Sequence, residues 1–149
     1  MGDPPRAHIR NRQRALSIDA RAVRRLAARV LAEESGGAAG VGIVFVRDGV
    51  IAELNARYLG KPRPTDVIAF PADPTGWPNE EPASLGEVVV SVDRAREQAR
   101  ERGLRVRQEL HRLIVHGILH LCGYRDATPR QRRRMRRRED RYLRAPRGT

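Results

Sequence analysis

The chain has 149 residues, enough for one domain with a real core, and 30 Lys and Arg against 18 Asp and Glu give a formal net charge of +12. No run of about 18 apolar residues occurs and the N-terminus lacks the apolar stretch of a secretory signal, so we expect a cytoplasmic protein with no membrane span. The single cysteine, Cys122, excludes an internal disulfide and a four-cysteine zinc site. All cations except Lys61 are arginines, and this excess predicts a polyanion partner, most simply nucleic acid, over a basic surface kept for solubility.

The N-terminal part of the chain predicts a strand and a helix. Residues 1–6 are rich in proline and are expected to be loose, and residues 7–12 are expected to form a short strand. Ser17 is the predicted N-cap of a helix in which apolar residues recur at helical spacing, until Gly36 and Gly37 end it.

Three apolar, β-branched runs follow, and each predicts a strand: residues 41–46, 67–70 and 86–92. Between the first two, Asp48-Gly49 is typical of a turn, and residues 51–58 indicate a short helix that Gly60 and Pro62 stop. Residues 72–83 are rich in proline and predict a surface loop, in which Trp77 is expected to anchor the loop rather than to stack on a base, although the sequence leaves both open.

The C-terminal part predicts three consecutive helices. Asp93 is the expected cap of the first, which ends at Gly103, and the second is a strongly apolar helix over residues 106–122 followed by Gly123. Residues 128–131 have the form of a capping box for an arginine-rich terminal helix. A tail that extends to residue 149 follows this helix. This order predicts one α+β domain over residues 1–149, with about five helices packed on a small mixed sheet of four strands.

Histidines on the apolar helix form the candidate site. His116 and His120 are four residues apart, so both side chains leave one face of the helix, the spacing with which zinc-binding helices present two imidazoles. His111 points about 140° away and is expected at the surface or in a cap. Asp126 follows the Gly123 turn and can reach back. The predicted ligands at the end of this helix are therefore His116, His120 and Asp126, for a divalent ion that is Zn²⁺ in first place, although such a set also suits iron or manganese.

Other interpretations of these residues compete with metal binding. A histidine pair at this spacing also arises by chance, and Asp126 can instead cap the next helix. Zinc proteases of this helix type carry a glutamate directly after the first histidine, where this chain has Gly117, so the spacing argues against a peptidase. Cys122 lies about 200° round the helix from His120 and is predicted to pack in the core.

The residues around the histidines resemble a known family. HGILHLCGY at residues 116–124 is similar to the signature H-G-x-L-H-L-x-G-Y-D-H of the YbeY family, the metal-dependent endoribonucleases of bacterial rRNA maturation. PTDVIAFP at residues 64–71 looks like the family's P-T-D-V-L-S-F-P, and LGEVV at residues 85–89 looks like its L-G-D-I-V-I strand. The resemblance is strongest over about residues 40–126.

This resemblance implies a single-strand-specific endoribonuclease of 16S rRNA 3′-end maturation and ribosome quality control. Its partners would be rRNA and the small ribosomal subunit, and it would need no dinucleotide cofactor. The family's three-histidine zinc site falls on His116, His120 and position 126, where this chain has Asp126, and Arg125 stands where the family has aspartate. A carboxylate in place of an imidazole lowers the charge of the site by one and should make a metal-bound water less acidic.

A second departure from the family lies in the predicted short helix. Family members usually have Tyr-Arg where this chain has Tyr58-Leu59, and a leucine cannot contact phosphate. Lys61 and Arg63 are the candidates to contact the phosphate instead, with Arg57 as the other neighbour. In phosphodiester hydrolysis a metal-bound water would be the nucleophile, and these cations would clamp the phosphoryl oxygens.

The predicted terminal helix carries seven arginines in residues 130–138. They leave only a narrow apolar stripe with Met135 and Leu143, and their mutual repulsion disfavours the isolated helix. The alternative to an RNA-binding helix is a solvated one, partly paired with Glu139 and Asp140. The residues expected to bind RNA are Arg132, Arg133, Arg136 and Arg137.

Two other functions stay open at this point. The changes at Leu59 and Asp126 are compatible with a catalytically weakened family member that only binds rRNA or the ribosome. The metal group by itself is also compatible with a metallohydrolase that acts on another substrate.

Overall fold

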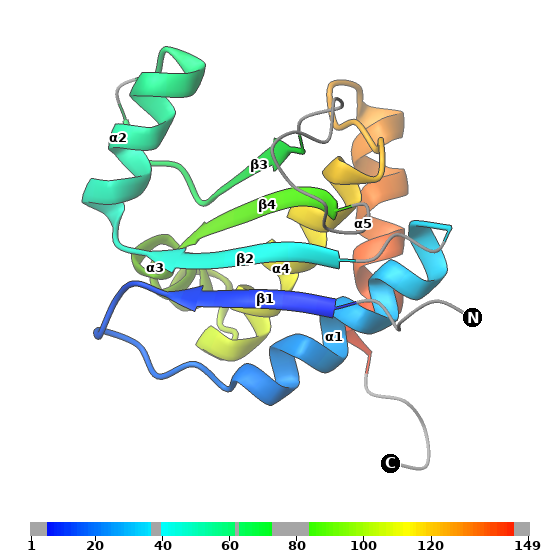
Figure 1. Ribbon diagram of the computed structural model, residues 1–149, viewed down its shortest axis with the longest axis horizontal. Helices are drawn as coiled ribbons and strands as arrows, with labels where there is room; N and C mark the ends of the chain where they lie inside the picture. The colour runs from blue at the N-terminus through cyan, green and yellow to red at the C-terminus, as the bar shows by residue number, and fades with distance from the viewer. Residues whose placement is uncertain (1–5, 37–39, 62, 73–83, 145–149) are drawn as a thin grey trace.

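The structure is a computed structural model that describes residues 6–36, 40–61, 63–72 and 84–144 (Figure 1). Expectations for residues 1–5, Gly37, Pro62, the loop with Trp77 and the tail from residue 145 lie outside these ranges. In chain order the elements are β1 (Arg6–Asn11), α1 (Ala20–Glu34), β2 (Gly40–Val46), α2 (Asp48–Leu59), β3 (Val67–Pro71), β4 (Ser84–Ser91), α3 (Val92–Arg102), α4 (Val106–Leu121) and α5 (Pro129–Leu143). The predicted α+β class with five helices is confirmed, although Arg6 belongs to β1 and not to a loose end.

The four strands form one mixed sheet in the order β1-β2-β4-β3, as the predicted class requires. β1, β2 and β4 run parallel, and β3 pairs with β4 in the antiparallel direction. β2 and β4 are the central strands, and they are also the two with the most continuous apolar sequence, because a central strand of this kind is buried on both faces.

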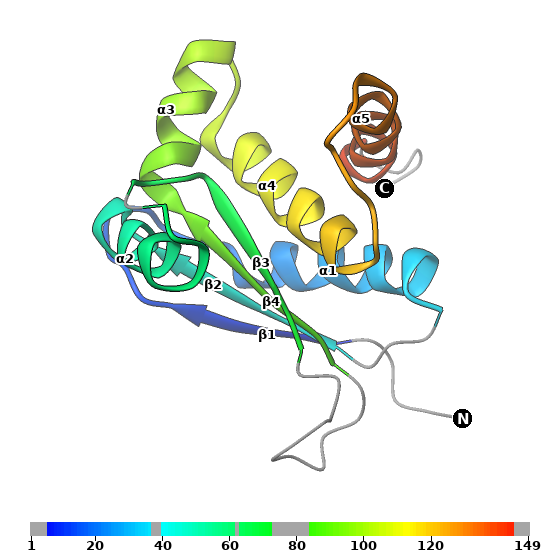
Figure 2. The same cartoon turned by 90° about the horizontal axis from the view of Figure 1, so that it is seen from above.

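Alternation along the central strands divides the interior into two cores. Ile43 and Phe45 of β2 and Val88 and Val90 of β4 point into the main core, together with buried side chains of α1, α3, α4 and α5. The intervening residues of both strands point into a smaller core with Ile51 of α2. Figure 2 shows α1, α4 and α5 on the same side of the sheet.

Helix α4 lies between the sheet and α5 and is buried on most of its surface (Figure 2). Glycine at position 117 lets this helix approach the sheet, because a Cβ there would overlap the Cγ1 atom of Val88. The buried side chains of α4 fix its rotation, and this rotation sends His116 and His120 toward the surface. None of the helices within the described ranges is long and apolar enough to cross a membrane.

Three predicted helix starts were wrong. Helix α1 is capped by Asp19, whose carboxylate accepts a hydrogen bond from the Ala22 amide, and not by Ser17. Asp48 and Gly49 form the first turn of α2 rather than a separate turn.

The cap of α3 is Ser91 rather than Asp93. The Ser91 hydroxyl accepts from the Arg94 amide and donates to Asp48 at 2.6 Å. The Asp93 carboxylate instead accepts hydrogen bonds from the Arg47 side chain and the Asp48 amide. Each acid is therefore placed by a neighbour 43 to 46 residues away in the sequence, which local patterns do not contain.

Candidate metal centre

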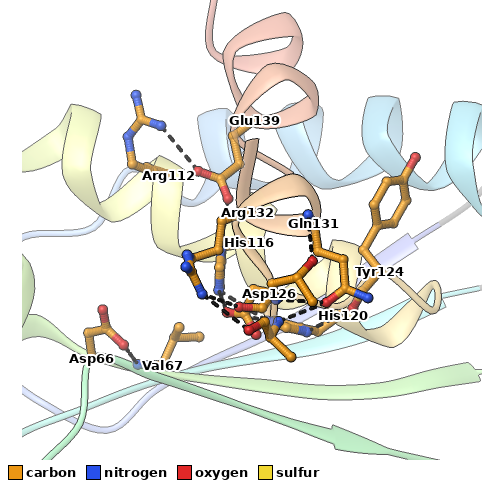
Figure 3. A network of polar contacts seen from close by, with 12 residues as sticks. Asp66, Val67, Arg112, His116, His120, Tyr124, Asp126, Gln131, Arg132 and Glu139 are labelled. Carbon is orange, nitrogen blue, oxygen red and sulfur yellow. Dashed lines mark hydrogen bonds and ion pairs between the residues drawn. The ribbon is translucent and has the colours of Figure 1, made fainter. Parts of the chain in front are cut away.

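His116 and His120 meet at the C-terminal end of α4. Their Nε2 atoms are 3.1 Å apart, and their ring centroids are 4.6 Å apart. Figure 3 shows both rings pointing toward Asp126. The predicted presentation of two imidazoles on one face is confirmed.

A tight turn after α4 brings Asp126 back to the histidines. Gly123 has φ of 98°, a conformation that a residue with a side chain rarely adopts, and the Tyr124 amide donates to the Leu119 carbonyl at 3.0 Å. As a result, Asp126 Oδ2 lies 3.4 Å from His120 Nε2 and 3.6 Å from His116 Nε2.

The separations of these three atoms fit one metal ion. Tetrahedral zinc with bonds of 2.0–2.1 Å has ligand atoms about 3.3 Å apart, and the three separations here are 3.1, 3.4 and 3.6 Å. The side chains of His116, His120 and Asp126 keep 26%, 29% and 47% of their surface exposed, so the outer side of the group is open. Two imidazoles, one carboxylate and an open side are a donor set that could hold a divalent metal ion, and zinc, iron and manganese all accept such a set.

Each histidine is oriented through its other ring nitrogen. His116 Nδ1 lies 2.7 Å from Glu139 Oε2, and His120 Nδ1 lies 3.0 Å from the Tyr124 carbonyl oxygen. Both partners are acceptors, so each neutral ring carries its proton on Nδ1 and leaves the lone pair of Nε2 facing the other two ligand atoms.

Charges around His116 favour its protonated form when no cation is bound. Burial opposes that form, but the hydrogen bond that His116 donates to Glu139 and the negative charges of Glu139, Asp126 and Asp66 outweigh it and raise the pKa of His116. The same negative charges would favour a divalent cation, which would displace the proton from His116 on binding.

His116, His120 and Asp126, here called the metal group, lie between two hollows that are lined in part by basic side chains. Lys61 and Arg63 line one hollow together with His120 and Asp126. Arg132 and Arg136 line the other together with His116 and Asp126. The structure thus brings four of the six predicted RNA contacts to the rim of the metal group.

The other two predicted RNA contacts lie elsewhere. Arg137 faces a separate basic hollow with Arg29 and Arg144, and Arg133 is exposed on α5 outside the hollows described. Glu139 and Asp140 do not neutralise the arginines of their own helix, because both pair with Arg112 of α4.

The structure also shows where four other residues singled out in the sequence lie, namely Arg57, Leu59, His111 and Cys122. Leu59 is 52% exposed and lines the hollow of Lys61 and Arg63, whereas Arg57 pairs with Glu53. As predicted, His111 does not contribute to the metal group, but it is half-buried rather than at the surface and does not cap α4. The predicted packing of Cys122 against the main core is confirmed, and burial raises the pKa of its thiol.

Sequence reasoning missed two residues that support the site. Glu139 follows Met135 by four residues, so it lies on the buried stripe of α5, and an acid on such a stripe signals a buried partner. Asn55 is buried in α2 and donates to the Arg63 carbonyl at 2.9 Å, which holds the segment with Lys61 and Arg63. No local sequence pattern predicts the contact between Asn55 and Arg63.

Comparison with known proteins gives one consistent family. The profile described as "Endoribonuclease YbeY" matches residues 8–146. Proteins with that description include one from Syntrophus aciditrophicus, 39% identical over 78% of this chain and 72% of its own length, and one from Pelotomaculum thermopropionicum, 44% identical over 75% of each chain. Another, from Syntrophotalea carbinolica, is 36% identical over 89% of both.

The fold is also similar to a solved structure. The solution structure of a Thermotoga maritima protein superposes with a TM-score of 0.64, at 26% identity over 92% of this chain and 86% of that one. This similarity covers nearly all of the chain, and the family match over residues 8–146 includes His116, His120 and Asp126.

Proposed function

The chain belongs to the YbeY endoribonuclease family, hydrolases that cleave RNA, and on that premise we propose that it cuts single-stranded RNA with a divalent ion held by His116, His120 and Asp126. The proposed ion is Zn²⁺. The proposed substrate is the 3′ end of 16S rRNA during maturation, with the small ribosomal subunit as partner, the cytoplasm as location and a part in ribosome quality control. The proposed unit of function is the single domain of residues 1–149, with its terminal helix included.

One observation carries this proposal. Three ligand atoms 3.1 to 3.6 Å apart lie on an open rim, with the exposed cations Lys61 and Arg63 in the hollow on one side and Arg132 and Arg136 in the hollow on the other. A phosphodiester at this rim would have the ion on its reacting oxygen and cations on the phosphates to either side.

The residues have separate roles in the proposed reaction. A divalent ion in this set would supply Lewis acidity to the phosphoryl oxygen and a water more acidic than bulk water, although less so than in a set of three histidines. Lys61 and Arg63 would hold the non-bridging oxygens, and Arg132 and Arg136 would bind the strand on the other side. Both pairs of cations are exposed, so they can reach a polyanion without first breaking a buried ion pair.

A second candidate function has one specific observation in its favour. Leu59 contributes an apolar side chain to the hollow of Lys61 and Arg63, and Asp126 makes the ligand set less positive than three histidines would. A family member that binds rRNA with weakened cleavage would have these two features.

Cleavage and metal content together test the proposal. The purified protein and the His116→Ala variant are incubated with one labelled RNA in single-stranded and duplex form, with and without EDTA, and metal is measured by elemental analysis. His111→Ala is the matched control, because it removes a histidine from the same helix outside the metal group.

We expect cleavage of the single strand only, about one equivalent of metal, and loss of both in His116→Ala but not in His111→Ala. Metal binding and RNA binding without cleavage would favour the weakened family member. Cleavage that continues undiminished in EDTA would contradict the metal-dependent reaction.

A further inference from the structure

The inner side of α5 contacts the residues of the metal group. We propose that α5, and Glu139 above all, positions the ligands of the metal ion, so that the arginine-rich helix is a structural part of the metal centre and not only an RNA-binding surface. This inference rests on the proposed function in that it takes His116, His120 and Asp126 as the ligands.

The first contact is between Glu139 and His116. Only 6% of Glu139 is exposed, and its two oxygens are divided between two partners: Oε2 accepts from His116 Nδ1 at 2.7 Å, and Oε1 accepts from Arg112 at 3.1 Å (Figure 3). Arg112 compensates the buried charge and limits the rotation of the carboxylate. The carboxylate therefore fixes both the tautomer of His116 and the plane of its ring, which decides where Nε2 points.

The second contact supports His120 through Tyr124. The Tyr124 carbonyl accepts from His120 Nδ1, so the position of this residue sets the orientation of the second ring. The Tyr124 side chain is held by α5 on two sides, because Arg138 Nε donates to its hydroxyl at 3.1 Å and the guanidinium of Arg134 lies 4.9 Å from its ring centroid. Its hydroxyl also donates to Glu34 of α1 at 2.8 Å.

The third contact supports Asp126. Arg132 donates from Nη1 to the carbonyl oxygens of Asp126 and Ala127, each at 3.3 Å. Arg132 is exposed, so we expect this contact to contribute less than the buried one at Glu139. All three ligands are thus connected to α5, and the strongest connection is the most buried one.

A series of substitutions at Glu139 tests the inference by metal affinity. Zn²⁺ affinity is measured by competition with a chromophoric chelator, and the visible absorption spectrum of bound Co²⁺ reports the ligand geometry. Glu139→Gln keeps an oxygen acceptor for His116, and Glu139→Leu keeps the volume but no acceptor. Asp140→Asn is the matched control, because Asp140 is the neighbouring acid and also pairs with Arg112 but does not contact a metal ligand.

We expect Zn²⁺ affinity to fall about 10-fold to 100-fold in Glu139→Leu, with an altered Co²⁺ spectrum. Glu139→Gln should keep part of the affinity, and Asp140→Asn should match the wild type. Unfolding of the metal-free proteins by urea identifies any variant that fails to fold, and Glu139→Gln then remains as the test.

Two results would overturn parts of the argument separately. Unchanged Zn²⁺ affinity and an unchanged Co²⁺ spectrum in both Glu139 variants would refute the positioning role alone. A wild-type protein that binds neither ion would refute the metal site of the proposed function, whatever the variants do.

Discussion

At the scale of single residues, Gly117 lets α4, the helix that carries His116 and His120, pack closely against the sheet. A Cβ at this position would overlap Val88 Cγ1 and lie 3.0 Å from its Cγ2 and 3.3 Å from Val67 Cγ2. The sheet thus excludes any side chain here, including the glutamate that a zinc protease would need. This packing supports the sequence argument against a peptidase with a physical reason.

We predict that Gly117→Ala destabilises the protein. Helix propensity alone would favour alanine by about 1 kcal/mol, whereas overpacking costs about 1–3 kcal/mol, so a net loss in urea unfolding identifies the clash. Gly49→Ala in α2 is the control, because a Cβ there meets no atom within 4 Å, and it should be neutral or stabilising. Stabilisation by Gly117→Ala would show that Val88 yields without cost.

His111 gives a prediction about pH. Burial is the main cause that lowers the pKa of His111, nearby Arg107 adds to the effect, and Asp19 opposes it. The folded protein therefore resists protonation at this site, and as the pH falls below about 6.5 the unfolded chain gains a proton that the folded one does not.

His111 should accordingly reduce stability on the acidic side of neutrality. We expect His111→Gln to lose less stability than the wild type between pH 7.5 and pH 5, as measured by urea midpoints in EDTA. EDTA removes the competing effect of metal on the other histidines. Parallel stability profiles for the two proteins would mean that His111 titrates normally in the fold.

At the scale of elements, α5 shows how a helix with many like charges is held in place. Its N-terminus is closed by a capping box in which the Thr128 hydroxyl accepts from the Gln131 amide and the Gln131 side chain accepts from the Thr128 amide. Along the helix, Arg138 and Arg141 pair with Glu34 and Glu33 of α1. Acids of another helix, and not those of α5 itself, offset part of the repulsion.

The Thr128 cap should contribute measurably to stability. We expect Thr128→Ala to lower the unfolding free energy by about 1 kcal/mol, within the range of 0.5–2 kcal/mol for the removal of an N-cap. Gln131→Ala should cost less, because the hydroxyl cap remains. Urea unfolding followed by circular dichroism measures both, and an unchanged midpoint in Thr128→Ala would show that packing of Met135 and Tyr142 alone fixes the start of the helix.

At the scale of the whole molecule, the net charge of the chain is +12, and the arginines of α5 that contribute to it lie on two sides of the helix. Arg136 faces the hollow with the metal group, and Arg137 faces a second hollow with Arg29 of α1. A strand that reaches the metal group would meet the first side, and only a longer RNA would meet both.

We therefore predict different effects for two neighbouring substitutions. Arg136→Gln should reduce cleavage of short and long single-stranded RNA, whereas Arg137→Gln should weaken binding of long RNA only. For each phosphate that a variant no longer neutralises, the slope of log K against log salt should fall by about 0.7 on single strands. Equal effects of the two variants on short RNA would mean that the two sides of α5 are not distinct.

Features that depend on neighbours along the chain were predictable from the sequence. Strand and helix periodicity, the presentation of His116 and His120 on one face, and the Gly123 turn that returns Asp126 all follow from the geometry of a few consecutive residues. The metal group was predictable for this reason, because its three residues span only 11 positions, from 116 to 126.

Features that depend on distant partners are set by the folded chain. The order of the strands, the rotation of α5 and the contact of Glu139 with His116 join residues 23 or more positions apart, and packing rather than local pattern selects them. The same reason explains the wrong cap at Asp93, because Ser91 donates to Asp48 and Asp93 accepts from Arg47. The wrong cap at Ser17 has a local cause, because α1 begins at Ala20, directly after Asp19. Local geometry thus brings His116, His120 and Asp126 together, and the packing of α5 on α4 places Glu139 against the ring of His116.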